Sequence, residues 1–256
     1  MNYLLGAIAD ICGAELWGRD CTVSSVTTDS RSPWCDGGTL FVALRTALRD
    51  GHDFIAQMYS RGVRAFLVEK YPDLTLYPQA GFVVAGDTLE ALQTLAAHHR
   101  RGFGGTLVAV TGSSGKTVVK EWIAQSAPEG VRLFRSPGSY NSQIGVPLSV
   151  LMIGGDEHIA VIEAGISREG EMSSLERILR PDVGIFTTIG AAHQENFDSV
   201  RDKIIEKARL FKGCSRIIYD GDYREVGEVL SEQCPASQLT DSSTLKEVYE
   251  IGRAHV

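Results

Sequence analysis

The sequence lacks the features that mark several large classes of protein. No apolar run reaches the ~18 residues that a transmembrane helix requires, and the N-terminus has Asp10 but no basic flank or small-residue cleavage site. The five cysteines are odd in number and widely spaced, with no Cys-x-x-Cys pair, which argues against a disulfide framework and a zinc site. We therefore expect a cytoplasmic protein without a membrane partner.

Positive charge is also scarce. The 256 residues include 25 Lys plus Arg against 32 Asp plus Glu, a net charge of −7, and no run of basic residues occurs. Proteins that coat nucleic acid or anionic membranes depend on a basic surface, so we expect no nucleic-acid partner. Any phosphate group that this protein binds must be held locally, by a few residues.

Apolar runs alternate with segments of helical period, which is the pattern of a parallel sheet with crossover helices. The sequence therefore predicts an α/β fold. The predicted strands are Thr39 to Leu44, Ala65 to Val68, Gly81 to Val84, Thr106 to Val110, Ile159 to Ile162, Val183 to Thr187 and Arg216 to Tyr219. The predicted helices are Asp53 to Ser60, Thr88 to His99, the stretch after Thr117 to about Gln125, Gln143 to Leu151, Met172 to Leu179 and Ser199 to Phe211.

A change in composition at residues 100–105 indicates a domain boundary. Two arginines and three glycines fall within these six residues, a composition suited to a hinge or linker. We predict an N-terminal domain over residues 1–102 and a second domain over 103–250. Residues 251–256 resemble a translated sequencing adapter, so we treat them as an artefact and expect the natural chain to continue beyond Glu250.

A glycine loop, Gly112-Ser113-Ser114-Gly115-Lys116-Thr117, lies between a predicted strand and a predicted helix. Its glycines allow backbone N–H groups to face a phosphate, Lys116 adds a positive charge, and the Thr117 hydroxyl can contact Mg²⁺. The longer P-loop pattern has glycine where this chain has Val110, so the match is to a shorter form. A chance Gly/Ser turn is the alternative, but the strand before and the helix after favour phosphate binding.

Three further residues are candidates for the same site. Glu163 ends the apolar run Ile159 to Ile162, and a buried strand would deliver it to the carboxyl edge of the sheet, where ligands bind and where a carboxylate can hold Mg²⁺. His193 follows the next strand and could reach that edge, although a lone histidine is more often a satisfied loop residue. Lys207 lies on the helix from Ser199, where spacing alone predicts a solvent-exposed lysine like Lys203.

Several motifs taken together resemble those of the Mur ligases. The motifs similar to the family's central domain are Thr111 to Thr117, Asn141 to Pro147, Glu163 to Gly165 with Gly170-Glu171, and Arg180-Pro181-Asp182 through His193 to Lys207. The motifs similar to its uridine-nucleotide-binding domain are Thr28 to Arg31, Gly38 to Leu44 and Asp50 to Phe54. The resemblance covers about residues 20–222.

The resemblance implies an N-terminal uridine-nucleotide-binding α/β domain followed by a P-loop ATP-binding α/β domain. The family also has a third, C-terminal domain that helps to bind the nucleotide and the incoming amine, and this chain stops before it. In some bacteria an alanine racemase is fused after that domain. The chain departs from the family at Tyr219-Asp220-Gly221-Asp222, which lacks the asparagine expected near the adenine.

The resemblance also implies roles for single residues. Lys116 would hold the triphosphate of ATP, Thr117 and Glu163 would bind Mg²⁺, and His193 would bind a second Mg²⁺. Lys207 would be carbamylated and orient Mg²⁺, which makes Lys116, His193 and Lys207 the implied catalytic residues. On the substrate side the implied residues are Ser30 and Arg31 for the uridine nucleotide, and Asn141 for the phosphate and muramyl groups.

Within the family, Gly115 to Glu121 and Glu163 to Glu171 are most similar to the member that adds D-alanyl-D-alanine to UDP-N-acetylmuramoyl-tripeptide in peptidoglycan precursor synthesis. The implied reaction forms an amide through an acyl phosphate: a substrate carboxylate attacks the γ-phosphate, ADP leaves, and the amine displaces phosphate. The diamino-acid-adding ligase is the second candidate within the family. Outside it, the candidates are a small-molecule P-loop kinase, which needs no amine, and a nucleotide-binding fragment without turnover, which is what we expect of the 256 residues alone.

Overall fold

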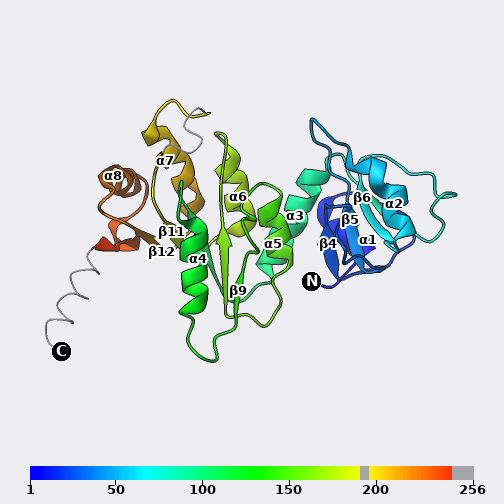
Figure 1. The fold of residues 1–256 in the computed structure, drawn as a ribbon, viewed down its shortest axis with the longest axis horizontal. Helices are drawn as coiled ribbons and strands as arrows, with labels where there is room; N and C mark the ends of the chain where they lie inside the picture. The colour runs from blue at the N-terminus through cyan, green and yellow to red at the C-terminus, as the bar shows by residue number, and fades with distance from the viewer. Residues whose placement is uncertain (191–195, 244–256) are drawn as a thin grey trace. The chain divides into compact units, whose positions relative to one another are not determined.

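The computed structural model describes residues 1–190 and 196–243. These residues have the predicted α/β class, with sheets that are mostly parallel. The chain divides into two compact units (Figure 1). The first comprises Met1–Phe103 with Val150–Gly154, and the second comprises Gly104–Ser149 and the residues from Gly155 onward. The adapter-like residues 251–256 lie outside the described part. No helix in the described part is long and apolar enough to cross a membrane.

The first unit contains a five-stranded sheet with the strand order β2-β7-β6-β5-β4. The strands β4 to β7 are parallel, and β2 runs antiparallel along β7. The bounds are β2 (Glu15–Gly18), β4 (Ser25–Thr27), β5 (Thr39–Val42), β6 (Ala65–Val68) and β7 (Gly81–Val84). The remaining elements are the antiparallel pair β1 (Tyr3–Leu4) and β3 (Thr22–Val23) and the helices α1 (Leu5–Cys12), η1 (Gly51–Phe54), α2 (Ile55–Ser60) and α3 (Thr88–Arg101).

Burial on both faces explains why the central strands of this sheet are readable in the sequence. Every residue of β5 and β6 is buried, and strands of this kind are continuous apolar runs. The rings of Phe66 and Phe82 stack at 5.0 Å in the core between the sheet and α2. By contrast, all four residues of β2 are exposed, so its sequence carries no such run and does not predict a strand.

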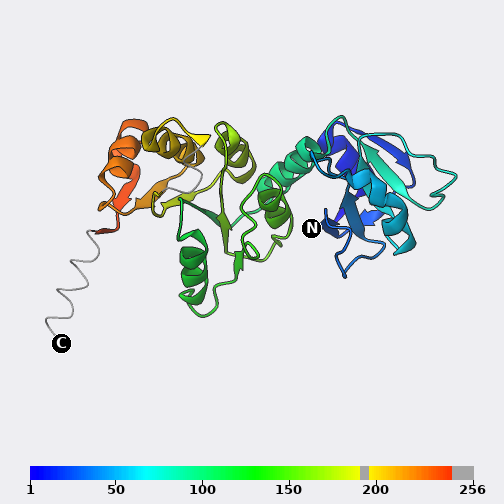
Figure 2. The same ribbon diagram turned by 45° about the horizontal axis from the view of Figure 1, so that its top comes forward.

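The second unit contains a six-stranded sheet in which all strands are parallel, with the order β13-β12-β11-β8-β10-β9. Its strands are β8 (Thr106–Thr111), β9 (Leu133–Arg135), β10 (Ile159–Glu163), β11 (Val183–Phe186), β12 (Arg216–Tyr219) and β13 (Leu239–Asp241). The helices described after Gly104 include α4 (Lys116–Gln125), α5 (Gly145–Leu151), α6 (Glu171–Leu179), α7 (Val200–Ala208), η3 (Arg209–Phe211), α8 (Arg224–Gln233) and η4 (Ala236–Gln238). Figure 2 shows helices on both faces of this sheet.

The position of β8 decides where the site lies. It is flanked by β10 and β11, with Glu163 paired to Val110 and Phe186 paired to Thr111. The glycine loop after β8 is therefore bordered by the residues that end β10 and follow β11. This is the carboxyl edge of a parallel sheet beside its central strand, where open α/β sheets bind ligands.

The predicted helix from Ser199 begins with the predicted cap. Ser199 Oγ accepts a hydrogen bond from Asp202 N at 3.0 Å and donates one to Asp202 Oδ2 at 2.6 Å, which satisfies a backbone donor at the helix start. The α-helix ends at Ala208, and η3 carries the chain on to Phe211. The sequence does not predict the edge strands β9 and β13, because each has three residues and none of them is buried.

Gly184, in the middle of β11, gives a test of the packing in the second unit. A Cβ on Gly184 would overlap the ring of Phe211, which is fully buried. We expect Gly184→Ala to lower the free energy of unfolding by ~1–3 kcal/mol, the usual effect of overpacking a core, as measured by urea denaturation. Gly213→Ala is the matched control because a Cβ there meets no atom within 4 Å. Equal unfolding free energies for the two variants would contradict this account.

Candidate functional site

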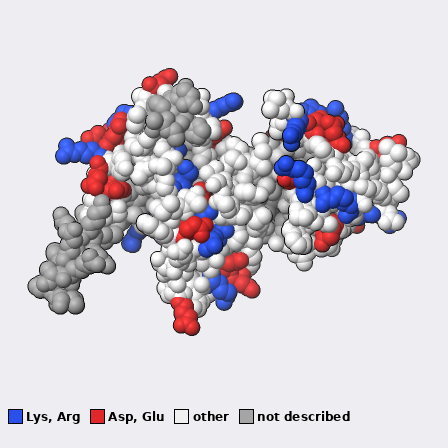
Figure 3. Space-filling model, viewed as in Figure 1, with Lys and Arg blue, Asp and Glu red and all other residues white. Residues whose placement is uncertain are grey.

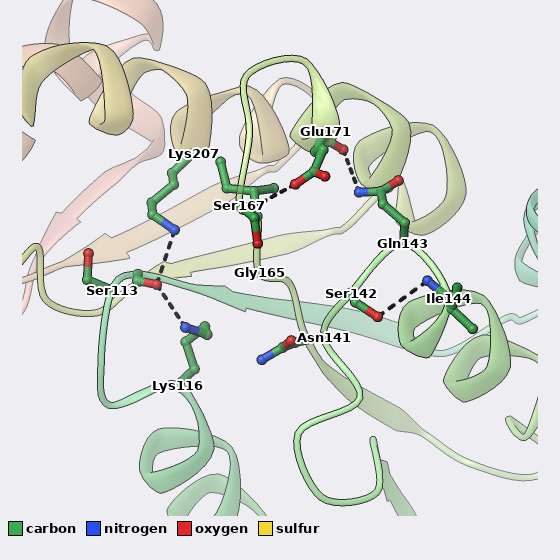
Figure 4. A pocket seen from close by; sticks show the side chains of 12 residues that line it. Ser113, Lys116, Asn141, Ser142, Gln143, Ile144, Gly165, Ser167, Glu171 and Lys207 are labelled. Carbon is green, nitrogen blue, oxygen red and sulfur yellow. Dashed lines mark hydrogen bonds between the residues drawn. The ribbon is translucent and has the colours of Figure 1, made fainter. Parts of the chain in front are cut away.

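A cavity of about 270 Å³ lies at the carboxyl edge of the second sheet (Figure 4). Its wall comes from four segments: the glycine loop, the turn before α5, the loop between β10 and α6, and the side chain of Lys207 on α7. These segments are distant in sequence, but each follows a strand of the same sheet or packs on that edge. The cavity thus brings together candidates that the sequence could only place separately.

The glycine loop is held in shape by the residues after β11. Gly112 and Gly115 have φ values of 145° and 81°, which favour glycine. A Cβ on Gly112 would overlap Thr187 Oγ1, and that hydroxyl donates to Thr111 O at 3.1 Å and Ser114 O at 2.6 Å. Sequence reasoning missed Thr187, since a threonine at the end of a strand gives no signal of its contacts.

Two lysines from different helices meet at the Gly112 carbonyl. Lys116 Nζ donates to Gly112 O at 2.9 Å and Lys207 Nζ donates to it at 3.2 Å (Figure 4). Burial lowers the pKa of Lys116. Burial, reinforced by the positive charges of Lys116 and Lys203, lowers the pKa of Lys207 to about 7. This end of the cavity suits an anion, because the Lys116 ammonium and the protonated fraction of Lys207 face one neutral carbonyl.

The prediction that Lys203 and Lys207 are solvent-exposed is wrong for both residues. Lys203 is fully buried and donates to Gly190 O, and Lys207 is 4% exposed. The two are four residues apart and so lie on one face of α7. Spacing along a helix cannot tell a lysine that meets buried carbonyls from one that meets water, and only the resemblance singled out Lys207.

Glu163 lies where the sequence placed it, at the end of β10, and is completely buried. Its Oε2 accepts a hydrogen bond from Thr117 Oγ1 at 3.1 Å. Its Oε1 is 2.9 Å from the ammonium of Lys120, which is also completely buried. Lys120 was missed as a site residue, because a lysine four residues after Lys116 reads as part of a solvated helix face.

Thr117 and Glu163 together offer two hard oxygen donors. Among the residues that the structure describes, no three His, Cys, Asp or Glu side chains gather as a metal site. Mg²⁺ characteristically takes only one or two carboxylates from a protein and completes its shell with phosphates and water, so this small donor set fits it. His193, the candidate ligand of a second ion, lies outside the described residues.

The wall of the cavity opposite the glycine loop is polar, and hydrogen bonds connect the segments that form it. Gly165 N donates to Asn141 O at 2.7 Å. Glu171 Oε2 accepts from the backbone N–H groups of Ser167 at 2.7 Å and Arg168 at 3.0 Å, and Gln143 Nε2 donates to Glu171 O at 3.0 Å. The candidate Asn141 therefore stands at the cavity beside a loop held by hydrogen bonds.

In the first unit the candidates Ser30 and Arg31 lie in the loop after β4. The Arg31 guanidinium makes a two-point contact with Asp29, at 2.9 and 3.0 Å, and its side chain is 80% exposed. Hydrogen bonding to Arg31 lowers the pKa of Asp29. Arg61 Nη1 donates to Ser30 O at 2.5 Å. Several Lys and Arg side chains lie on the face of this unit drawn in Figure 3.

Two hydrogen bonds of the His52 ring hold the loop after β5. Glu69 N donates to His52 Nε2 at 2.9 Å, so the ring proton is on Nδ1, which donates to Asp50 Oδ1 at 2.5 Å. Hydrogen bonds from the backbone and ring of His52 lower the pKa of Asp50 to about 2. The Asp50-Gly51-His52 motif therefore fixes this loop.

The motifs on this edge match a known family model. The model of the Mur ligase middle domain matches residues 110–243, just over half of the chain. The chain belongs to the Mur ligase family. The matched residues include the glycine loop, Asn141, Glu163, Thr187 and Lys207, so the residues that line the cavity lie inside the matched range.

Curated Mur ligases match a larger share of the chain than the family model does. The sequence is 37% identical over 213 residues to the UDP-N-acetylmuramoyl-tripeptide--D-alanyl-D-alanine ligase of Escherichia coli K12, covering 83% of this chain and 46% of that protein. It is 35% identical over 205 residues to the enzyme of the same name from Bacillus subtilis 168, covering 78% and 44%. The chain therefore spans about half the length of these relatives.

Solved structures of Mur ligases share the fold. A crystal structure of MurF from Acinetobacter baumannii matches with a TM-score of 0.85 and 24% identity, covering 94% of this chain and 53% of that one. The MurF ligase of Thermotoga maritima, solved in complex with ADP, matches with a TM-score of 0.72 and 28% identity, covering 82% and 49%.

Lys207 should make the stability of this chain depend on pH. Its pKa is about 7 in the fold against 10.5 for a free lysine, so between these values the unfolded chain binds more protons. The free energy of unfolding therefore rises with pH across this window, by up to about 1.4 kcal/mol per pH unit from this group. We expect Lys207→Met to lose that slope in urea denaturations from pH 7.5 to 9.5 in bicarbonate-free buffer.

The control for this measurement is Lys212→Met, which changes an exposed lysine and should keep the wild-type slope. Parallel pH dependences for the wild type and Lys207→Met would show that the lysine is not held with a depressed pKa.

Proposed function

We propose that this chain provides the uridine-nucleotide and ATP sites of a ligase that adds D-alanyl-D-alanine to UDP-N-acetylmuramoyl-tripeptide. The observation that carries the proposal is one cavity in which Lys116 and Lys207 converge beside Asn141, next to the hydrogen-bonded pair of Thr117 and the buried Glu163. Relatives bearing the name of that ligase match over most of the chain. Peptidoglycan precursor synthesis is the corresponding process.

The glycine loop and α4 suit the phosphates of ATP. Ser113 N already donates to Thr188 O at 2.7 Å. The groups left to meet a phosphate are the first N–H groups of α4 and the ammonium of Lys116. Thr117 and Glu163 would hold Mg²⁺, which neutralises charge on the phosphates during transfer. The Thermotoga maritima relative was solved in complex with ADP, which supports nucleotide binding by this fold.

Lys207 is suited to carbamylation. The reaction joins the neutral amine nitrogen to the carbon of CO₂ and releases one proton. An unperturbed lysine near pKa 10.4 is only about 0.04% neutral at pH 7, whereas a pKa of about 7 leaves about half of the amine neutral. The carbamate would carry a negative charge beside the Lys116 ammonium, which shares the Gly112 carbonyl with Lys207.

The residues of this site would position the reacting groups and stabilise their charge. None of these residues needs to act as a nucleophile. The substrate carboxylate would attack the γ-phosphate to give an acyl phosphate and ADP, and the amine of D-alanyl-D-alanine would then displace phosphate. Phosphoryl transfer depends mainly on positioning and electrostatics, which Lys116 and the N-terminus of α4 supply. Asn141, on the opposite wall, would orient the muramyl side of the substrate.

Two competing enzyme functions share parts of this site. A P-loop kinase would use the same phosphate cradle, but it would not need the first unit, where Arg31 lies exposed in the loop after β4. A diamino-acid-adding ligase shares the fold: a ligase of that kind matches with a TM-score of 0.53 and 14% identity. The identities to the D-alanyl-D-alanine ligases favour addition of D-alanyl-D-alanine over both.

Calorimetric titration with UDP-N-acetylmuramoyl-tripeptide tests the function. We expect this chain to bind the tripeptide and to bind the corresponding dipeptide more weakly. Arg31→Ala should weaken binding because it removes an exposed charge from the proposed uridine-nucleotide side, whereas Arg19→Ala, another exposed arginine of the first unit, should not. Absence of tripeptide binding, or stronger binding of the dipeptide, would contradict the proposed substrate.

Lys116→Ala tests the nucleotide site separately. Loss of one charge-assisted contact of about 1.5–3 kcal/mol should weaken Mg-ATP binding roughly 10- to 150-fold. Lys212→Ala is the control, and circular dichroism establishes that each variant is folded. Unchanged Mg-ATP affinity in folded Lys116→Ala would remove the glycine loop from the proposal.

A further inference from the structure

Lys120 is a buried cation for which the proposed reaction has no use. Its ammonium donates to Ser136 O at 2.8 Å and to Gly138 O at 2.6 Å, and it lies 2.9 Å from Glu163 Oε1. An ammonium has three N–H groups, and two of them are fixed by these carbonyls. Because the side chain has no exposed surface, Lys120 cannot turn away from Glu163 toward water.

The charge of Glu163 is therefore already balanced before any metal ion is present. The charges beyond this pair also cancel: Glu121 Oε1 is 3.5 Å from Lys120 Nζ, and Arg135 Nε is 3.2 Å from Glu121 Oε2. On the cavity side, Lys116 lies close enough to Glu163 for the carboxylate to act on its pKa. A divalent cation without nucleotide would thus meet an ion pair of zero net charge and, beside it, the positive charge of Lys116. These charges together exert no net attraction on the cation.

The phosphates of a nucleotide would change this balance. They would be drawn to Lys116 and to the N-terminus of α4. They would add negative charge beside Glu163, whose own charge is balanced by Lys120. Glu163 would still offer Oε2, the oxygen on the Thr117 side, because Lys120 occupies the Oε1 side.

We propose that Lys120 is a fixed counter-ion of Glu163, and that it makes this site take up a divalent cation only together with nucleotide phosphates. The inference rests on the proposed function, in which the glycine loop binds the nucleotide and Thr117 and Glu163 hold Mg²⁺. Lys120 is a positioning residue here: it acts through Glu163 and touches neither substrate nor nucleotide.

A purely structural role for Lys120 is the competing explanation. The lysine links α4 to β10 and to the turn at residues 136–138, so its loss would lower stability in any case. A structural link does not predict any change in how the folded protein binds a free cation. A counter-ion does, because its removal leaves Glu163 negative and open to another cation.

The test measures binding of Mn²⁺, used in place of Mg²⁺, by electron paramagnetic resonance in CO₂-free buffer, with and without saturating ADP. The wild type should bind Mn²⁺ with ADP and much more weakly without it. Lys120→Met, close to lysine in shape but neutral, should bind Mn²⁺ without ADP about tenfold or more tighter than the wild type. Lys212→Met, the same change at an exposed site, should behave as the wild type.

Two results would overturn the inference: a wild type that binds Mn²⁺ equally well with and without ADP, or a folded Lys120→Met with wild-type Mn²⁺ affinity in the absence of ADP. If Lys120→Met does not fold, Lys120→Gln, which is also neutral and keeps a donor for the two carbonyls, takes its place in the same measurement. Failure of the proposed function is distinguishable. It would appear as no ADP binding, or as a Glu163→Gln variant whose ADP complex binds Mn²⁺ as the wild type does, and either would remove the site itself.

Discussion

The contact between Gly112 and the hydroxyl of Thr187 is the constraint on which the rest of the site depends. Only a residue without a Cβ allows the strand ends of β8 and β11 to approach this closely, and the Thr187 hydroxyl then fixes the loop through Thr111 O and Ser114 O. The Gly112 carbonyl is thereby presented to Lys116 and Lys207. Two helices far apart in sequence thus direct their lysines to one point because one loop is pinned.

The overall negative charge of the chain conceals a local excess of positive charge. Three lysines, Lys116, Lys203 and Lys207, are close enough for the first two to lower the pKa of the third, while the sequence as a whole carries a net charge of −7. Each ammonium is held by a backbone carbonyl. Burial against carbonyls concentrates positive charge at the cavity without a basic surface, which is why composition alone could not reveal it.

Much of the fold could be predicted from the sequence, and less of the site. The bounds of β6, β7 and β12 agree with prediction because strands of parallel sheets leave apolar runs between turn residues. The glycine loop and Glu163 were found because a strand end locates them. Lys120 and Lys203 were not, since their contacts with Glu163, Ser136, Gly138 and Gly190 cross between distant segments, and a lysine on a helix looks the same whether it meets water or buried oxygens.

The hydrogen bond from Lys116 to Gly112 O means that the ammonium is held in place before a ligand arrives. The bond uses one of the three N–H groups of the lysine, at 2.9 Å, so a ligand can accept from another N–H group without displacing the carbonyl. Fixing a long, freely rotating side chain normally costs about 0.5–1.5 kcal/mol of binding free energy. Because the fold has already restricted this lysine, a ligand bears less of that cost.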